Sequence, residues 1–336
     1  GIGAFGIAYN LYRHWQMHHA PDSGRGTLHA GWVGLSGALG MVVLGNLGNV
    51  KLLYENYLRA GSSGAATEGT FFLVRWLWAL RGFIMSLTGV RMEIPLDQWY
   101  WNASRVMPPD DQAITEFPFF SILYGDPHAH VFSMAIAPLA LGFAIAFVLG
   151  RGRWKGILSA ACSFLFGGLA ISALRPTNTW DFYPYLALAV VAVLYTLLAN
   201  AEPAEGLRRR LPVLRSLPQV SLRLVTALLG VVVLVTLVEL FFKPYTDWYG
   251  LGYGEVGLWE GPRTPLSSYF VHWGLFLFVI ASWLVWESVE WMSSTPVSAL
   301  NSLRPHKGLL QAAGLLVLAA VGALLLYGVS IGWVRS

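Results

Sequence analysis

Long runs of apolar residues alternate along the chain with short charged or Pro- and Gly-rich stretches. A membrane-spanning helix needs about 20 mostly apolar residues, and such a helix satisfies its own backbone hydrogen bonds inside the bilayer. The pattern therefore predicts an all-α fold, a polytopic transmembrane helical bundle with about 7–8 spans. The predicted spans are a partial span at 1–12 and full spans near 28–50, 131–150, 156–174, 180–199, 222–242, 266–286 and 308–332.

The apolar stretch near 70–90 differs from the others because Arg75 and Arg81 interrupt it, with Trp76 and Trp78 between them. Arginine at mid-membrane is costly, whereas tryptophan prefers the membrane interface. This stretch predicts a helix that lies in the interface or re-enters it. It falls within a long outer segment at 51–130.

Basic residues gather in short connections between the predicted spans, and this sets the orientation. If each span crosses once, four basic connections lie on one side, which the positive-inside rule makes cytoplasmic. One of them is the connector at 200–221. The four are 13–26, 151–155, 200–221 and 287–307, and the opposite side then holds 51–130, 175–179 and 243–265.

Composition agrees with a membrane environment: 55% of the 336 residues are hydrophobic and 12% are charged. A soluble domain carries roughly 25% charged residues, so the composition excludes a disordered chain and a disulfide scaffold and argues against a soluble enzyme. The net charge of +4 sits in loops, so it does not indicate nucleic acid. We predict a multi-pass plasma-membrane protein with a single transmembrane domain at 1–336, surrounded by membrane lipids. Gly1 already lies in an apolar segment, so we expect a helix or loop to precede it.

The three predicted outer segments contain most of the side chains that can do chemistry. Asp126-Pro127 and Thr264-Pro265 have the form of helix starts, and Asn178 or Thr179 can cap a helix near Trp180. All three helix N-termini would point outward with the positive end of the helix dipole. Together with three nearby cations they predict a site for a phosphate or pyrophosphate; the cations are Arg175, Lys243 and Arg263.

Asp126, His128 and His130 are suitable ligands for a divalent metal ion such as Mg or Mn. The two histidines diverge by about 200° on a helix, so both can face one ion only if the turn is extended or irregular. The alternative for Asp126 is a simple N-cap. Tryptophan and tyrosine on this side are typical of an interfacial belt and can also stack on sugar rings.

The stretch from Glu116 to His130, EFPFFSILYGDPHAH, closely resembles the signature of the uncharacterised YYY membrane-protein domain family (Chlor_Arch_YYY). GNLGN at 45–49, NTWDF at 178–182 and SYFVHWGLFLF at 268–278 are similar to it too. That family is thought to be related to membrane glycosyltransferases of the GT-C class. The resemblance implies a GT-C-like fold. It also implies an enzyme that transfers a sugar from a polyprenyl-phosphate donor on the extracytoplasmic side.

Two hypotheses follow. In the first, a GT-C-type glycosyltransferase uses a carboxylate, first Asp126 and second Glu116, to deprotonate the acceptor hydroxyl. In the second, the chain is a non-catalytic structural subunit of a larger complex, and its small-residue spans pack against membrane protein partners. The transferase hypothesis requires the outer residues to meet in one cavity. Its candidates for binding the substrate or its phosphate are Arg175, Asn178, Trp180, Asp181, Lys243, Tyr245, Arg263 and His272, and its metal ligands are Asp126, His128 and His130.

Overall fold

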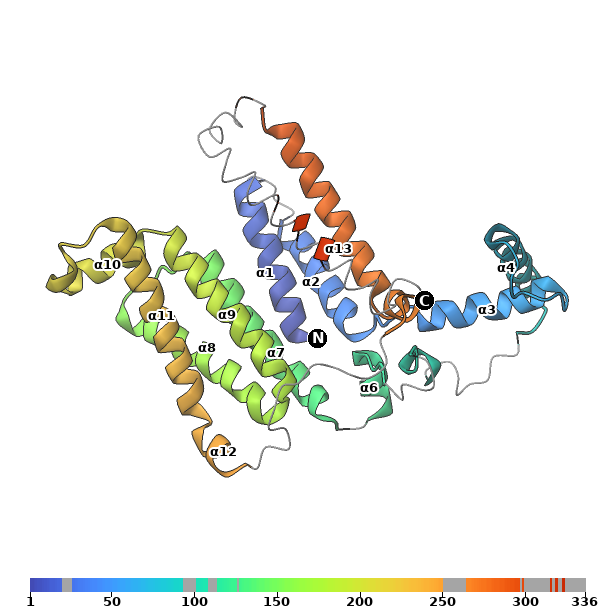
Figure 1. Ribbon diagram of the computed structural model, residues 1–336, viewed down its shortest axis with the longest axis horizontal. Helices are drawn as coiled ribbons and strands as arrows, with labels where there is room; N and C mark the ends of the chain where they lie inside the picture. The colour runs from blue at the N-terminus through green and yellow to red at the C-terminus, as the bar shows by residue number, and fades with distance from the viewer. Residues whose placement is uncertain are drawn as a thin grey trace. The chain divides into compact units, whose positions relative to one another are not determined.

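The computed structural model describes most of the chain, and every regular element in that part is helical (Figure 1). The chain divides into two compact units, described separately below. The first unit contains 1–44 and 121–257, and the second contains 45–120 and 258–336. The described residues are 1–19, 26–92, 101–107, 114–125, 127–249 and 264–296, with 298, 315, 318, 319, 322 and 323.

Five helices of the described part are long and apolar enough to cross a membrane. They confirm an all-helical membrane protein and match five predicted spans, whereas the span at 308–332 falls largely outside the described residues. The count of 7–8 spans and the GT-C-like architecture stay predictions. The five helices are α7 (Ala129–Leu149), α8 (Ile157–Thr177), α9 (Thr179–Ala199) and α11 (Gln219–Phe241) in the first unit, and α13 (Leu266–Ser294) in the second.

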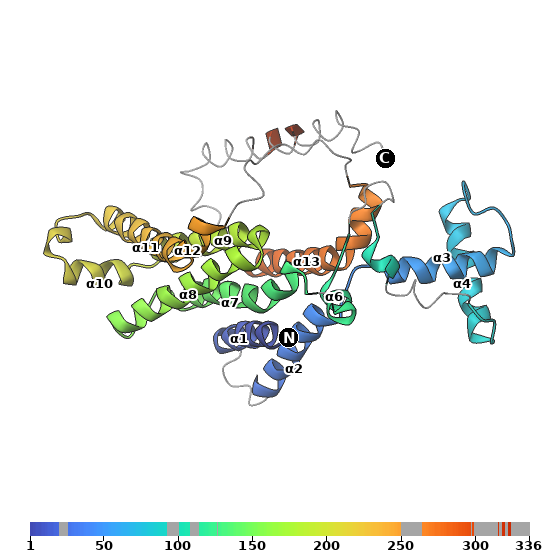
Figure 2. The same ribbon diagram turned by 90° about the horizontal axis from the view of Figure 1, so that it is seen from below.

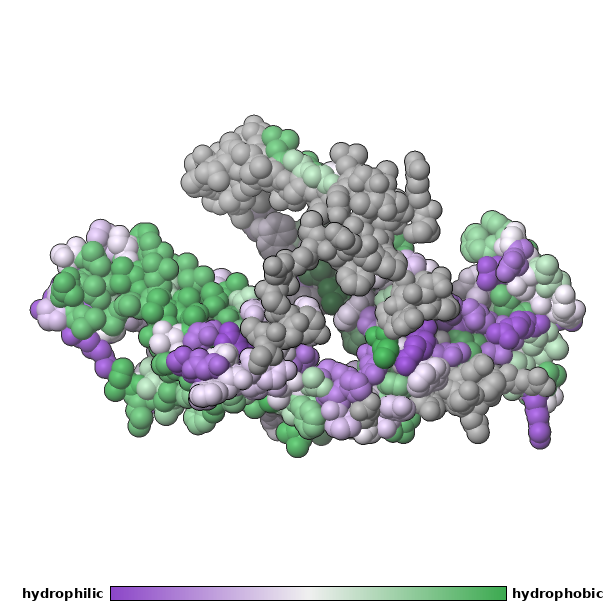
Figure 3. All heavy atoms as spheres, turned by 60° about the horizontal axis from the view of Figure 1, so that its bottom comes forward, coloured by the Kyte–Doolittle hydropathy of each residue, from purple (hydrophilic) through white to green (hydrophobic). Residues whose placement is uncertain are grey.

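In the first unit, α7, α8, α9 and α11 pack side by side around a core of fully buried apolar side chains. Ile171, Phe182 and Leu234 are at its centre. Apolar side chains also cover the outside of these helices, as the green surface at the left of Figure 3 shows for the part that contains α11. An apolar interior inside an apolar exterior is expected when the surrounding solvent is lipid.

Shorter or less apolar helices complete this unit. Two of them, α1 and α2, pack against each other, and α1 also packs against α7 (Figure 2). Their bounds are α1 (Ile2–His19), α2 (Gly26–Val42), α6 (Pro118–Tyr124), which crosses the boundary between the units, α10 (Glu202–Arg210) and α12 (Lys243–Trp248), with a 3₁₀ turn at Pro212–Leu214.

Ion pairs place the connections of the bundle at two opposite ends. Arg153, in the loop between α7 and α8, pairs with Glu202 at the start of α10. Arg175, at the end of α8, pairs with Glu239 at the end of α11. The basic connections at 151–155 and 200–221 therefore lie at the same end of the bundle. This arrangement is the one predicted if each span crosses the membrane once. That this end faces the cytoplasm stays a prediction.

The second unit contains a helical hairpin of α3 (Gly48–Ser62) and α4 (Phe72–Leu87), together with α13 and a 3₁₀ turn at Asn102–Ser104. Helix α4 confirms that the stretch near 70–90 is helical, and its place in the membrane interface stays a prediction. Gly61 and Gly82 lie where the two helices cross, each against the backbone of the other helix. Only a residue without a Cβ atom permits so close an approach.

The predicted span at 28–50 is wrong in its second half, because α2 ends at Val42 and α3 begins at Gly48. Asn46 explains the break. Its side-chain oxygen accepts the Gly48 N–H at 2.8 Å, and its amide group donates to the Ala103 carbonyl at 2.6 Å. These bonds replace those of a continuous helix.

Candidate functional site

A cavity of about 530 Å³ lies within the first unit among α1, α2, α7 and α9. One end carries its polar side chains, His130, Ser133, Asp181 and Tyr185. The remaining wall is apolar or small, made by Ala4, Ile7, Ala8, Leu11, Gly37, Met41, Met134, Ala137, Pro138 and Leu141.

The polar end is built from the first turns of two helices. His130 and Ser133 are three residues apart on α7, and Asp181 and Tyr185 are four apart on α9. Residues at these spacings share a helix face, so each helix turns its pair toward the cavity. Two helix N-termini, with their free N–H groups, therefore border the polar end.

Asp181 is half-buried and firmly held. Its Oδ2 accepts a hydrogen bond from Ser133 Oγ at 2.5 Å and another from Asn178 Nδ2 at 2.9 Å. Among the described residues nothing donates to Oδ1. One oxygen thus fixes the carboxylate while the other can accept a proton from a molecule in the cavity.

The two histidines predicted as metal ligands lie close together at the start of α7. His128 is the N-cap of α7 in an extended conformation, and its ring centroid lies 5.8 Å from that of His130. His130 Nε2 is 3.0 Å from Ser121 Oγ on α6, which holds the imidazole at the cavity edge. Asp126, the third predicted metal ligand, lies outside the described residues, so the metal site stays a prediction.

Pro138 gives the cavity wall a second polar feature. It stands inside α7, where proline lacks the N–H that would bond to the carbonyl four residues earlier. The Met134 carbonyl therefore loses its helical donor. Gly3 of α1 lies against the proline ring, so the two helices are close here.

Two of the predicted helix caps are wrong by one or two residues. Helix α7 begins at Ala129 after His128, and α13 begins at Leu266 after Pro265. In α13 the N-cap proline is extended, with ψ of 142°, and its missing N–H costs nothing because a cap residue does not use it in the helix. Asn178 is confirmed as the N-cap of α9, although its side chain binds Asp181.

Arg175, predicted to bind phosphate, is already paired. Its guanidinium makes two hydrogen bonds to Glu239, at 2.8 and 2.9 Å, and stacks 4.2 Å from the centroid of the Phe182 ring. The arginine side chain is 18% exposed and the glutamate 50%. A bidentate pair of this kind is stronger than a single surface contact and joins α8 to α11.

Separate and combined Arg175→Gln and Glu239→Gln variants are expected to give a coupling energy of about 1–3 kcal/mol. This lies between the values for exposed pairs and for buried ones. Thermal unfolding of the purified protein measures it. The exposed Lys243–Asp247 pair, treated the same way, is the control and is expected to give about 0.3–0.5 kcal/mol. Equal coupling in the two pairs would contradict a structural role for Arg175.

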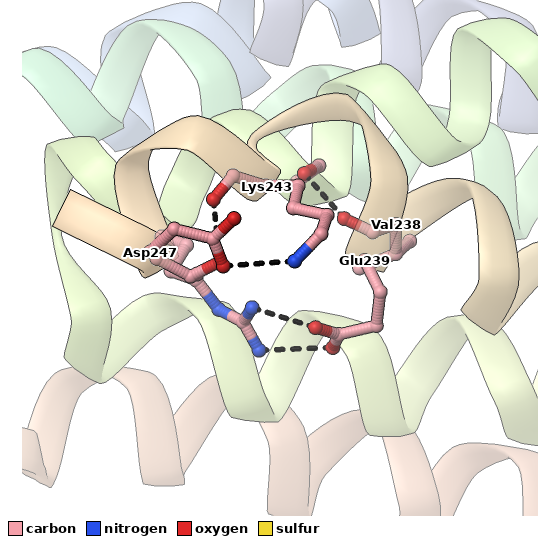
Figure 4. A network of polar contacts seen from close by, with 7 residues as sticks. Val238, Glu239, Lys243 and Asp247 are labelled. Atoms are coloured by element: carbon pink, nitrogen blue, oxygen red, sulfur yellow. Dashed lines mark hydrogen bonds and ion pairs between the residues drawn. The ribbon is translucent and has the colours of Figure 1, made fainter.

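Helix α12 carries two further predicted residues. Lys243 is bonded to Asp247 at 2.8 Å (Figure 4), and Tyr245 stacks on Tyr249 with ring centroids 4.7 Å apart. Desolvation and the adjoining Tyr249 hydroxyl raise the pKa of Tyr245. The shift favours the neutral hydroxyl, the form that can donate a hydrogen bond.

Within the described part of the first unit, none of the remaining predicted residues lines the cavity. Arg263 lies outside the described residues, as Asp126 does. Trp180 is 75% exposed at the start of α9. Glu116 and His272 belong to the second unit; the His272 ring packs edge-on against Trp273, 4.8 Å between centroids.

Sequence reasoning missed Ser133, Ser121 and Tyr185. The first lies three residues after His130, and the last lies four residues after Asp181. Helical spacing from these two predicted residues would have found them. Ser121 had no such signal, because its position depends on how α6 meets α7.

A family model described as an uncharacterized membrane protein (DUF2298) matches residues 1–335. Its name differs from that of the family that the 116–130 motif resembles. No curated protein and no solved structure matches the chain.

Proposed function

The chain belongs to the DUF2298 family of uncharacterised membrane proteins, and from its amphipathic cavity we propose that it transfers a sugar from a polyprenyl-phosphate donor. The observation that carries this proposal is a carboxylate with one unoccupied oxygen at the polar end of an otherwise apolar cavity, which lies between α1, α2 and the candidate membrane spans α7 and α9. A lipid-linked sugar matches this cavity, because its head group is polar and its long chain is apolar.

The length of the cavity supports a lipid-linked substrate. His130 at the polar end and Leu141 in the apolar wall are both on α7, which separates them by about 16 Å along the helix axis. Polar groups at one end and hydrocarbon over this distance would hold the head group near the outer ends of α7 and α9. The isoprenoid chain would run down toward the bilayer centre.

In the proposed reaction, Asp181 Oδ1 takes the proton from an acceptor hydroxyl, whose oxygen attacks the anomeric carbon of the sugar. The bond from this carbon to the phosphate oxygen breaks, and polyprenyl phosphate leaves with the electron pair. His130 and the N–H groups at the starts of α7 and α9 would hold the phosphate. Asp181 thus takes the role that the sequence assigned first to Asp126.

Filling the apolar end of the cavity tests the proposal. Leu141→Trp is expected to weaken binding of undecaprenyl-phosphate glucose or mannose at least tenfold, because the indole occupies the path of the lipid chain. Leu139→Trp is the matched control, since Leu139 is 61% exposed on the same helix and does not line the cavity. The measurement is binding and transfer of the radiolabelled donors by the purified protein in nanodiscs.

If the wild-type protein binds none of these donors, or if the two tryptophan variants bind them equally, the cavity is not a donor site. Unfolding temperatures of both variants show whether a loss of binding reflects a damaged fold.

The second candidate, a non-catalytic subunit, is favoured by α13. This helix has 29 residues and, within the described part of the chain, buries Ser268 alone, which leaves apolar surface there for lipid or a partner helix. Purification in a mild detergent that yields a fixed ratio of a second membrane protein, together with no donor binding, would favour this candidate over the transferase.

A further inference from the structure

A second hollow, of about 870 Å³, lies at the opposite end of the first unit from Asp181. We call it the basic-end groove. Its walls are α8 and α11, its floor includes Leu197 of α9, and α10 closes its end. It shares no lining residue with the cavity of the proposed function.

The groove exists because α8 and α11 touch at one end and separate toward the other. Near the Arg175 end, Ser172 Oγ donates to the Val238 carbonyl at 2.6 Å, and a Cβ at Gly168 would lie 3.0 Å from Leu237 Cβ. Toward α10, Phe164 and Leu229 face the open space between the helices. Gly230 lets Leu197 approach from α9 and form the floor.

The end of the groove near α10 is positively charged. Three arginines line it, Arg153, Arg209 and Arg210, against one carboxylate, Glu202. Arg153 pairs with that carboxylate. Within the described part of the chain, Arg209 and Arg210 make no ion pair, and both are exposed.

The groove has the depth of a single lipid leaflet. The lining residues of α11 run from Thr226 to Leu237, about 16 Å along the helix. A bilayer core is about 30 Å thick, so one leaflet takes roughly half of that. Trp154 and two free arginines at the charged end would then lie at head-group level, where tryptophan and arginine are favoured.

We propose that the basic-end groove binds an anionic membrane phospholipid. One acyl chain lies between α8 and α11, and the phosphate head group is held by Arg209 and Arg210. Charge complementarity favours this occupant, because two uncompensated cations lie at the mouth of an apolar groove. The bound lipid would fill the space between the separated ends of α8 and α11. It would also connect these ends to α10 through its head group.

The test uses the full chain purified in a neutral detergent. It is titrated with phosphatidylglycerol and with phosphatidylcholine, each carrying a photoreactive group in one acyl chain. We expect phosphatidylglycerol to bind at least tenfold tighter and to label the segment from Leu229 to Leu237. Arg209→Gln/Arg210→Gln is expected to weaken phosphatidylglycerol binding roughly fivefold for each arginine and to leave phosphatidylcholine binding unchanged.

Two matched controls separate the groove from general effects of charge and size. Arg151→Gln/Arg215→Gln removes the same charge from connections at the same end of the bundle, but neither residue lines the groove. Ala161→Trp fills the groove and is expected to abolish labelling by both lipids. Leu158→Trp, at an exposed position on α8 outside the groove, is expected to leave labelling intact.

Three results would overturn the proposal: equal affinity for the two lipids, an equal loss from the two arginine double variants, or labelling spread along all of α11. In a Val233→Cys variant, cross-linking of position 233 to residues 297–336 or to a second copy of the chain, in place of lipid, would also overturn it. Failure of this test leaves the transferase proposal untouched, because Asp181 and its cavity lie elsewhere.

Discussion

Replacing Asp181 by asparagine is expected to lower sugar transfer about 10²- to 10⁴-fold, the usual contribution of a positioned general base. The amide matches the carboxylate in size and can still accept hydrogen bonds from Ser133 and Asn178, which now bind Oδ2. It cannot accept a proton from the acceptor hydroxyl. Donor binding is therefore expected to change only a few-fold, and the loss to appear in the rate of transfer.

A graded series separates catalysis from helix stability. Asp181 also lies in the first turn of α9, where a negative charge stabilises the helix by about 0.3–1 kcal/mol. The unfolding temperature of Asp181→Asn is therefore measured beside its transfer rate. Ser133→Ala removes one of the two bonds that fix the carboxylate and is expected to slow transfer less than Asp181→Asn does.

Asp247→Asn is the matched control, because Asp247 pairs with Lys243 on α12 and does not line the cavity. We expect it to leave transfer within about twofold of wild type, as a surface substitution away from the reacting groups should. Wild-type transfer by Asp181→Asn, or equal losses in the two asparagine variants, would remove Asp181 from the catalytic role. A single-turnover assay with labelled donor gives the rate of the chemical step.

The long helices could be predicted from the sequence because each apolar run ends at residues that cannot stay in hydrocarbon. Helix α7 occupies 129–149 against a predicted 131–150, and its far end is set by Gly150 and the arginines that follow. The break at Asn46 could not be predicted this way. It depends on a bond to Ala103, 57 residues away, which hydropathy does not encode.

The candidate site was predicted only in part, for a related reason. Sequence placed His130 and Asp181 on the same side of the membrane, and both line one cavity. The same reasoning assigned Arg175 to a phosphate, because a lone arginine near helix starts attracts anions. Its partner Glu239 is on another helix, and pairing between distant helices follows from packing that local patterns do not determine.

Substituting alanine for Gly61 or Gly82 is expected to destabilise the α3–α4 hairpin by about 3 kcal/mol for each glycine, the upper range for overpacking. A Cβ at Gly61 would lie 1.8 Å from the Trp78 carbonyl oxygen, and one at Gly82 would lie 1.9 Å from that of Tyr57. Both obstacles are backbone atoms, which cannot rotate away. The helices would have to separate, and the bond from Arg81 to the Gly61 carbonyl would be lost.

Helix propensity alone predicts the opposite sign, since alanine in place of glycine inside a helix gains up to about 1 kcal/mol. Gly31→Ala in α2 is the control for that gain, because nothing lies within 4 Å of the added Cβ. Hydrogen exchange of the purified protein is expected to show lost protection across α3 and α4 in Gly61→Ala and Gly82→Ala, and none in Gly31→Ala. If all three variants keep wild-type protection, Gly61 and Gly82 are not required for the close approach of α3 and α4.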